Sequence, residues 1–173
     1  FLGSHLLLEL LKSDSHCIIH CLVRPRAAVD ASTPEARLMT HVHAALCASG
    51  YTNHEAHTKL GSLRERIRVV VGGLPDPKLG QTLVPLRFDE VWHVAGSMHF
   101  AERHRAAVHE ANVEGTRSLL AILGDCGVTR FNYVSTAYVA GPSSGPIAEA
   151  AVPVGMPANN SYEESKQLAE QTV

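Results

Sequence analysis

The chain has 173 residues, of which 45% are hydrophobic and 18% are charged, and its formal net charge is −2. This length suits one domain with a buried core and is too short for two ordinary domains. A nucleic-acid-binding protein is expected to have an excess of basic residues, and this chain has none. Its purely apolar runs are too short for a membrane span.

The N-terminal run FLGSHLLLELLKSD is predicted to be a helix from Gly3 to Lys12 and not a signal peptide. It has no basic segment before it and contains Glu9 within the apolar stretch. Because the chain begins inside this pattern without Met, we expect it to be a fragment of a longer protein. Four cysteines without CxxC spacing predict buried free thiols in a reducing cytoplasm: Cys17, Cys21, Cys47 and Cys126.

Further along the chain, short apolar runs alternate with helical patterns. The predicted strands are 17–23, 66–73, 90–96 and 130–136. The predicted helices are 33–49, capped by Thr33, a long one from about 102, and a last one beginning at Asn160 or Ser161. Apolar strands separated by helices indicate a parallel sheet covered on both faces. We therefore predict one partial domain over 1–173 with a Rossmann-like, doubly wound α/β fold, in which ligands bind beyond the carboxyl ends of the strands.

Tyr162 and Lys166 lie four residues apart on the last predicted helix, and this spacing places them on one face. A phenol is a poor proton donor at neutral pH, and a nearby ammonium stabilises the phenolate and lowers its pKa. The pair therefore indicates a general acid, although a solvated helix face would show the same spacing.

Three strand ends carry candidate ligand-binding residues. Arg24, followed by Arg26, comes after the strand 17–23, where an arginine suits the 2′-phosphate of NADP(H) and an exposed loop would also accept one. Small residues follow the strand 90–96, and their lack of bulk lets a cofactor approach the backbone: Ala95, Gly96 and Ser97. Ser135 and Thr136 end the run 130–136, where either hydroxyl could bind a substrate carbonyl or merely cap the strand.

The eleven histidines do not predict a metal site. His41 and His43 are two residues apart within a helical pattern, so their side chains diverge. No HExxH motif or paired cysteines accompany these or the pair His54 and His57. We predict that they are surface residues.

Taken together, the motifs resemble the extended branch of the short-chain dehydrogenase/reductase family. SYEESK is similar to its YxxxK motif, VSTAYVAG to its hydroxyl-bearing segment, HVAG to HxAA and ANVEGT to NxxGT. Gly3 resembles the last glycine of the TGxxGxxG phosphate loop. FLGSHLLLELL, CLVR, the long insert after it and VVVGGLPDPKLG resemble most closely the thioester reductase and fatty acyl reductase group.

The resemblance implies an NADPH-dependent oxidoreductase that reduces acyl thioesters, bound to CoA or to a phosphopantetheine carrier domain, to an aldehyde or an alcohol. It implies Tyr162 as the proton donor, Lys166 as its partner and a ligand of the nicotinamide ribose, and Thr136 as a second donor to the carbonyl oxygen, with Ser135 a substitute. Gly3, Arg24 and the segment 95–97 would bind the cofactor. Asn112 would organise the helix near the site.

Two departures from the family pattern qualify this expectation. The first strand and two glycines of the phosphate loop are absent, and Gly73 stands where the group usually has an Asp near the adenine. We expect the isolated fragment to be poorly stable and inactive. Two alternatives stay open: another extended family activity, such as a sugar-nucleotide epimerase or hydroxysteroid-type dehydrogenase, or a catalytically silent NADP-binding protein.

Overall fold

The computed structural model describes residues 1–173 except 26–32 and 77. Arg26 therefore lies outside the described residues. The chain divides into two compact units, Phe1–Gly73 and Leu74–Val173. They are described one at a time below, and the expectation of one domain over 1–173 stays a prediction.

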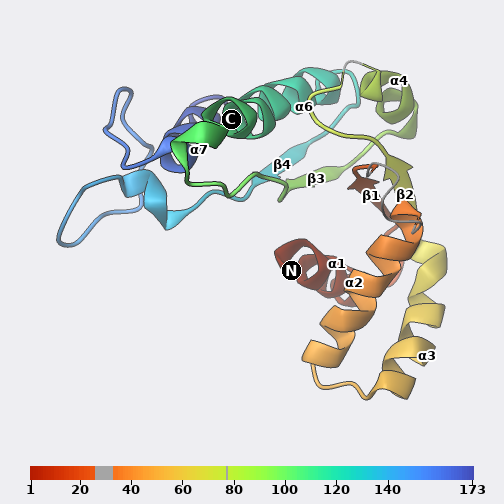
Figure 1. Ribbon diagram of the computed structural model, residues 1–173. Coiled ribbons are helices and arrows are strands. Elements are labelled where there is room, and N and C mark those ends of the chain that lie inside the picture. The colour runs from red at the N-terminus through yellow and green to blue at the C-terminus, as the bar shows by residue number, and fades with distance from the viewer. Residues whose placement is uncertain (26–32, 77) are drawn as a thin grey trace. The chain divides into compact units, whose positions relative to one another are not determined.

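The described residues of the first unit form one parallel pair of strands and three helices. β1 (Ile19–Val23) pairs with β2 (Ile67–Val71), with Ile19 opposite Ile67 and Val23 opposite Val71. α1 (Leu2–Ser13) precedes β1, and the crossover to β2 contains α2 (Pro34–Ala48), α3 (Asn53–Leu63) and a 3₁₀ turn, η1 (Arg64–Arg66). Figure 1 shows α2 and α3 as adjacent antiparallel helices. The core combines residues of all three helices with β2: Leu7, Leu8, Leu11, Met39, Val42, Ala45, Leu46, Ala56, Leu63 and Ile67.

Local sequence explains the ends of these helices. The Thr33 hydroxyl accepts a hydrogen bond from the Ala36 amide at 3.1 Å, which confirms it as the cap of α2. The helix α3 was not predicted, although its capping box is visible in the sequence. The Thr52 hydroxyl accepts from the Glu55 amide, and the Glu55 carboxylate accepts from the Thr52 amide.

The second unit contains the other parallel pair. β3 (Glu90–His93) pairs with β4 (Arg130–Tyr133), with Glu90 opposite Arg130 and His93 opposite Tyr133. The remaining elements are the following: α4 (Leu79–Leu83), η2 (Val84–Leu86), η3 (Glu102–His104), α5 (Arg105–His109), η4 (Glu110–Glu114), α6 (Gly115–Leu123), η5 (Ala137–Ala140) and α7 (Ser161–Glu170). All four predicted strands and their parallel pairing are confirmed, but each ladder is a few residues shorter than its apolar run.

The long helix predicted from residue 102 is interrupted. It begins as a 3₁₀ turn, and η4 is a π turn of five residues between α5 and α6. In a π turn each backbone hydrogen bond spans one residue more than in an α-helix, and such turns are common at functional sites. Here Asn112 and Val113 are buried within it, and the Thr116 hydroxyl donates to the Asn112 carbonyl at 2.6 Å. The turn thus directs a polar amide inward.

No helix in the described part of the chain is long and apolar enough to span a membrane.

Candidate functional site

The helix α7 presents Tyr162 and Lys166 to the interior of the second unit. Its first turn is fixed by Asn160, whose side chain accepts from the Glu163 amide at 3.0 Å and donates to the Glu163 carboxylate at 3.0 Å. This confirms the predicted start of the helix. Tyr162 is 8% exposed and Lys166 only 4% exposed. The solvated-face alternative is therefore excluded, because both side chains are buried.

The buried Lys166 ammonium is held at the carboxyl end of β4. Its Nζ donates to the Val134 carbonyl at 2.7 Å and lies 4.1 Å from the centre of the Tyr133 ring. A ring face attracts a cation, and this attraction grows when water is excluded. Burial lowers the pKa of Lys166 to about 8, and the Glu170 carboxylate opposes this shift. A group with such a pKa in a buried setting is a candidate for chemistry.

The Tyr162 hydroxyl has no hydrogen-bond partner among the described residues. Its ring packs edge-on against Phe100, with ring centres 5.1 Å apart and planes inclined by 68°. The ring is thus fixed while its hydroxyl is free to serve an external group. Lys166 hydrogen-bonds Val134 and not this hydroxyl, so the predicted influence of the ammonium on the phenol stays a prediction.

Two hydroxyls lie just beyond the end of β4. Thr136 caps η5, and its Oγ1 accepts from the Tyr138 amide at 3.3 Å, which leaves its own proton available to donate. The Ser135 hydroxyl is buried without a hydrogen-bond partner. Since buried polar groups are normally paired, an unpaired hydroxyl beside Lys166's carbonyl partner Val134 marks a place where an external polar group can bind.

Asn112 joins the loop after β3 to α7. Its Oδ1 accepts from the Ser97 amide at 2.6 Å, and its Nδ2 donates to the Ser97 carbonyl at 3.0 Å and the Ser165 hydroxyl at 2.9 Å. Ser165 donates in turn to the Tyr162 carbonyl at 2.7 Å. A methyl group on Gly96 would lie 3.3 Å from Asn112 Oδ1. The small residues predicted for cofactor access therefore also make room for this amide.

His93 is a buried residue of the site that the sequence did not single out beyond its place in HVAG. Its Nε2 lies 3.0 Å from Thr116 Oγ1, and Thr116 donates its proton to the Asn112 carbonyl. The His93 Nε2 therefore carries a proton and donates to Thr116. Burial, together with the Lys166 ammonium, lowers the pKa of His93 to about 4. The ring is neutral at physiological pH, so it orders the π turn without adding charge.

In the first unit, Arg24 follows β1 and is exposed, as is Gly3 in the first turn of α1. A methyl group on Gly73 would lie 3.6 Å from Arg24 Cγ and 3.8 Å from Arg24 Nε. The position where the family usually has an Asp is thus next to the arginine predicted to bind a 2′-phosphate. With glycine there, no carboxylate at that position competes for the guanidinium.

The described residues contain no group of three or more histidine, cysteine, aspartate or glutamate side chains placed to hold a metal ion. His43 contacts another histidine, His57 on α3. The distance from His43 Nε2 to His57 Nδ1 is 3.0 Å. The four cysteines are free thiols, as predicted, but only Cys126 among them is buried, and the other three are partly exposed.

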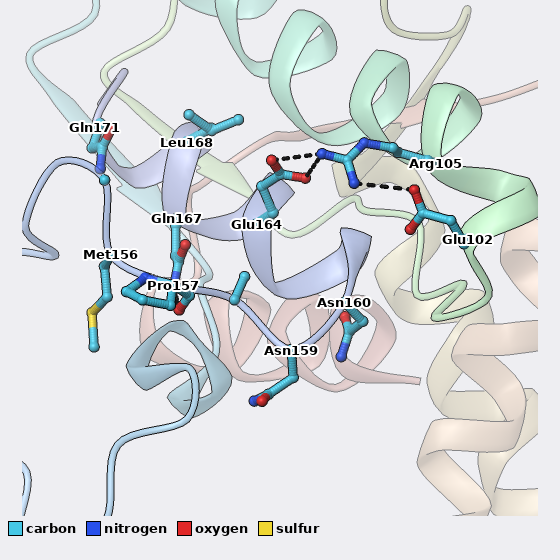
Figure 2. Close-up of a pocket in the computed structure, with 12 residues that line it drawn as sticks. Glu102, Arg105, Met156, Pro157, Asn159, Asn160, Glu164, Gln167, Leu168 and Gln171 are labelled. Atoms are coloured by element: carbon cyan, nitrogen blue, oxygen red, sulfur yellow. Dashed lines mark hydrogen bonds and ion pairs between the residues drawn. The ribbon is translucent and has the colours of Figure 1, made fainter.

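A cavity of about 450 Å³ lies on the face of α7 opposite to Tyr162 and Lys166. Figure 2 shows Arg105 bridging two carboxylates along this cavity. Arg105 is 3.1 Å from Glu102 and 2.5 Å from Glu164. The cavity is therefore separate from the buried pair.

These features define an α/β fold with a buried tyrosine–lysine pair, and comparison with known proteins assigns the chain to a nucleotide-binding family. A model of an NAD-binding family described as "Male sterility protein" matches residues 1–173, so the chain belongs to this family. The resemblance to the thioester reductase and fatty acyl reductase group of the extended short-chain dehydrogenases is confirmed.

Individual relatives share the fold and parts of the sequence. Glycine betaine reductase ATRR of Emericella nidulans is 33% identical over 148 residues, which are 83% of this chain and 11% of that protein. The terminal R domain of the myxalamid PKS-NRPS pathway has a TM-score of 0.75 at 26% identity, over 99% of this chain and 41% of that one. A thiolation-reductase di-domain from an archaeal non-ribosomal peptide synthetase has a TM-score of 0.71 at 23% identity, over 99% of this chain and 35% of that one. These matches confirm the Rossmann-like fold, and the chain spans less than half of each relative.

Proposed function

We propose that this chain is the cofactor-binding and catalytic part of an NADPH-dependent reductase of acyl thioesters. The observation that carries the proposal is the burial of both Tyr162 and Lys166 on α7, with Lys166 bound at the end of β4, in a member of an NAD-binding family. A phenol with a free hydroxyl next to a lysine of lowered pKa has the composition of a general acid site.

The residues present fit a nicotinamide dinucleotide. The segment Ala95–Ser97 offers backbone with little side-chain bulk, and the unpaired Ser135 hydroxyl can satisfy a polar group of the cofactor or substrate. Lys166 would hold the nicotinamide ribose. Arg24 beside Gly73 would bind the 2′-phosphate that distinguishes NADPH from NADH. The cofactor, when bound, supplies hydride to the carbonyl carbon.

The side chains of this chain would manage the charge on the carbonyl oxygen. Tyr162 gives its proton to that oxygen, and the hydroxyl of Thr136 donates a hydrogen bond to it. General acid catalysis of this kind contributes roughly 10²–10⁴-fold in rate, and a positioned hydroxyl stabilises the developing negative charge. Lys166 keeps a positive charge near the phenol so that the phenolate formed is stabilised.

Two similar structures support a thioester substrate for this chain. One is the terminal R domain of a PKS-NRPS biosynthetic pathway, and the other is a thiolation-reductase di-domain. A thioester reduced once is a hemithioacetal, whose C–S bond breaks to leave an aldehyde and a free thiol. A phosphopantetheine carrier domain or CoA would present the acyl group. A second reduction would give the alcohol.

The test uses the full-length protein that contains this segment and follows NADPH consumption with an acyl thioester bound to CoA or to a carrier domain. We expect Tyr162→Phe to lower kcat by about 100-fold or more. Tyr138→Phe is the matched control, since Tyr138 is an exposed tyrosine of the same unit. An unchanged rate in Tyr162→Phe, or no oxidation of NADPH with any thioester, would overturn the proposal. Sugar-nucleotide or hydroxysteroid turnover would favour another extended family activity, and cofactor binding without any turnover would favour a silent protein.

A further inference from the structure

Two histidines that are far apart in the sequence contact each other across the adjacent helices α2 and α3 (Figure 1). His43 Nε2, on α2, lies 3.0 Å from His57 Nδ1, on α3. The two ring planes are inclined by 62° with ring centres 4.3 Å apart, so the rings do not stack. His43 is half-buried and His57 is exposed, so the pair lies at the surface of the first unit.

A backbone carbonyl forms a triangle with these two nitrogens. The Asn53 oxygen, in the first turn of α3, is 3.0 Å from His57 Nδ1 and 3.4 Å from His43 Nε2. Two metal–ligand bonds of about 2.1 Å place their ligand atoms about 3.0 Å apart at an octahedral angle and about 3.4 Å apart at a tetrahedral angle. All three edges of the triangle lie within this range. The three atoms are therefore spaced as ligands of one ion would be.

Hydrogen bonds satisfy this triangle less well than a cation would. A carbonyl only accepts, so a proton on either nitrogen has to be shared between the other nitrogen and the Asn53 oxygen. Protons on both nitrogens would face each other. A cation, by contrast, interacts with the lone pairs of all three atoms at once.

We propose that His43, His57 and the Asn53 carbonyl bind a divalent transition-metal ion that prefers imidazole ligands, such as Zn²⁺. Zn²⁺ has no geometric preference of its own, and solvent can supply its remaining ligands at an exposed site. The site uses only two side chains, which agrees with the lack of a group of three among the described residues. The bound ion ties the end of α2 to the start of α3. The site is independent of the proposed reductase chemistry, whose tyrosine and lysine lie in the second unit.

Cys47 lies beside this site without being a ligand. Its Sγ is 3.9 Å from His43 Nδ1, and the lone pairs of the two ring nitrogens of a histidine point in different directions. When His43 Nε2 binds the ion, Nδ1 carries the proton and can donate it to the sulfur, which orients the ring. All three ligands are neutral, so we expect weaker binding than at zinc sites made of thiolates.

The experiment titrates Zn²⁺ into the full-length, chelator-treated protein by calorimetry and locates the ion by hydrogen exchange. We expect His43→Gln and His57→Gln each to lose one bound ion per chain. Zn²⁺ should slow amide exchange over 43–57 in the wild type and in neither variant, whereas Mg²⁺ should have no effect. His41→Gln and His54→Gln are the matched controls, because both remove exposed histidines of the same two helices and should keep the ion.

Three results would overturn the inference. Undiminished binding in His57→Gln would show that the pair is not a ligand set, and equal losses in the controls would show adventitious binding to surface histidines. Loss of the ion in Cys47→Ser would show that the thiol is a ligand, contrary to the proposed set. Because His57 is exposed, its variant tests the site even if His43→Gln disturbs the packing of α2.

Discussion

Lys166, with its buried ammonium group, is the residue on which the proposed chemistry most depends. It is paired with a neutral carbonyl and a ring face, and neither compensates for the loss of water as a carboxylate would. This explains why the pKa of Lys166 falls to about 8, close to working pH. A charge that can be lost so readily makes the activity sensitive to pH.

We predict that kcat/KM falls as the pH rises through about 8, because kcat/KM reports the ionisation of the free enzyme and the ammonium is lost above that value. The measurement is a pH profile of NADPH-dependent reduction in the full-length protein. Lys166→Arg keeps its charge, so its residual activity should show no decline near pH 8. A wild-type profile that stays flat well above pH 8 would contradict the prediction.

Arg24 is the residue that we expect to select the cofactor. We predict that Arg24→Ala raises the KM for NADPH by about 10- to 100-fold, since a charge-assisted hydrogen bond contributes about 1.5–3 kcal/mol, and leaves the KM for NADH unchanged. Arg68→Ala is the control, because Arg68 is also exposed in the first unit. Equal effects on both cofactors would show that Arg24 does not contact the 2′-phosphate.

Among the elements, η5 and the loop before α7 depend on one glycine. Gly141 ends η5 with φ of 57°, and a methyl group there would lie 2.1 Å from the Pro157 carbonyl. The Gln167 side chain donates to the Val139 and Pro157 carbonyls at 2.9 and 3.2 Å, so both segments are tied to α7. The loop has no freedom to move away without breaking these bonds.

We predict that Gly141→Ala lowers the free energy of unfolding by about 2–4 kcal/mol, because a backbone carbonyl must move to admit the methyl group. Gly155→Ala is a matched control in the same unit. Its φ of 77° is also positive, but nothing lies within 4 Å of the added carbon, so we expect a loss of only about 1–2 kcal/mol. Urea unfolding measures both, and equal losses would mean that the clash is relieved.

At the scale of the whole molecule, the same burial that prepares the site shapes the pH dependence of stability. His93 and Lys166 both have a lowered pKa in the folded state. At pH values between the pKa of the folded state and that of the unfolded state, the unfolded chain binds more protons than the folded protein does. The free energy of unfolding therefore rises with pH across that range. The windows run from about 4 to 6.5 for His93 and from about 8 to 10.5 for Lys166.

We predict that the free energy of unfolding decreases by about 3 kcal/mol as the pH falls from 6.5 to 4, because His93 is protonated on unfolding. This value follows from the lowering of the His93 pKa from 6.5 to about 4. His93→Gln retains a donor for Thr116 and cannot be protonated, so its stability should fall less steeply over this range. Chemical unfolding at a series of pH values measures the effect. Parallel curves for wild type and variant would show that His93 does not titrate on unfolding.

Local sequence determined most of the regular elements and the spacing of the tyrosine–lysine pair, whereas α3 was not predicted. The strands, the Thr33 and Asn160 caps and the Tyr162–Lys166 spacing all depend on residues a few positions apart, and each was predicted from them. The tertiary structure alone decided which groups surround that pair. Val134 and Tyr133 hold the ammonium, Asn112 reaches Ser97 through a π turn, and Phe100 leaves half its ring uncovered beside Tyr162. These contacts join residues that are far apart in the chain. Which side chains are buried there, and how far apart they lie, depends on how the elements pack, and this cannot be read from the spacing of residues in the sequence.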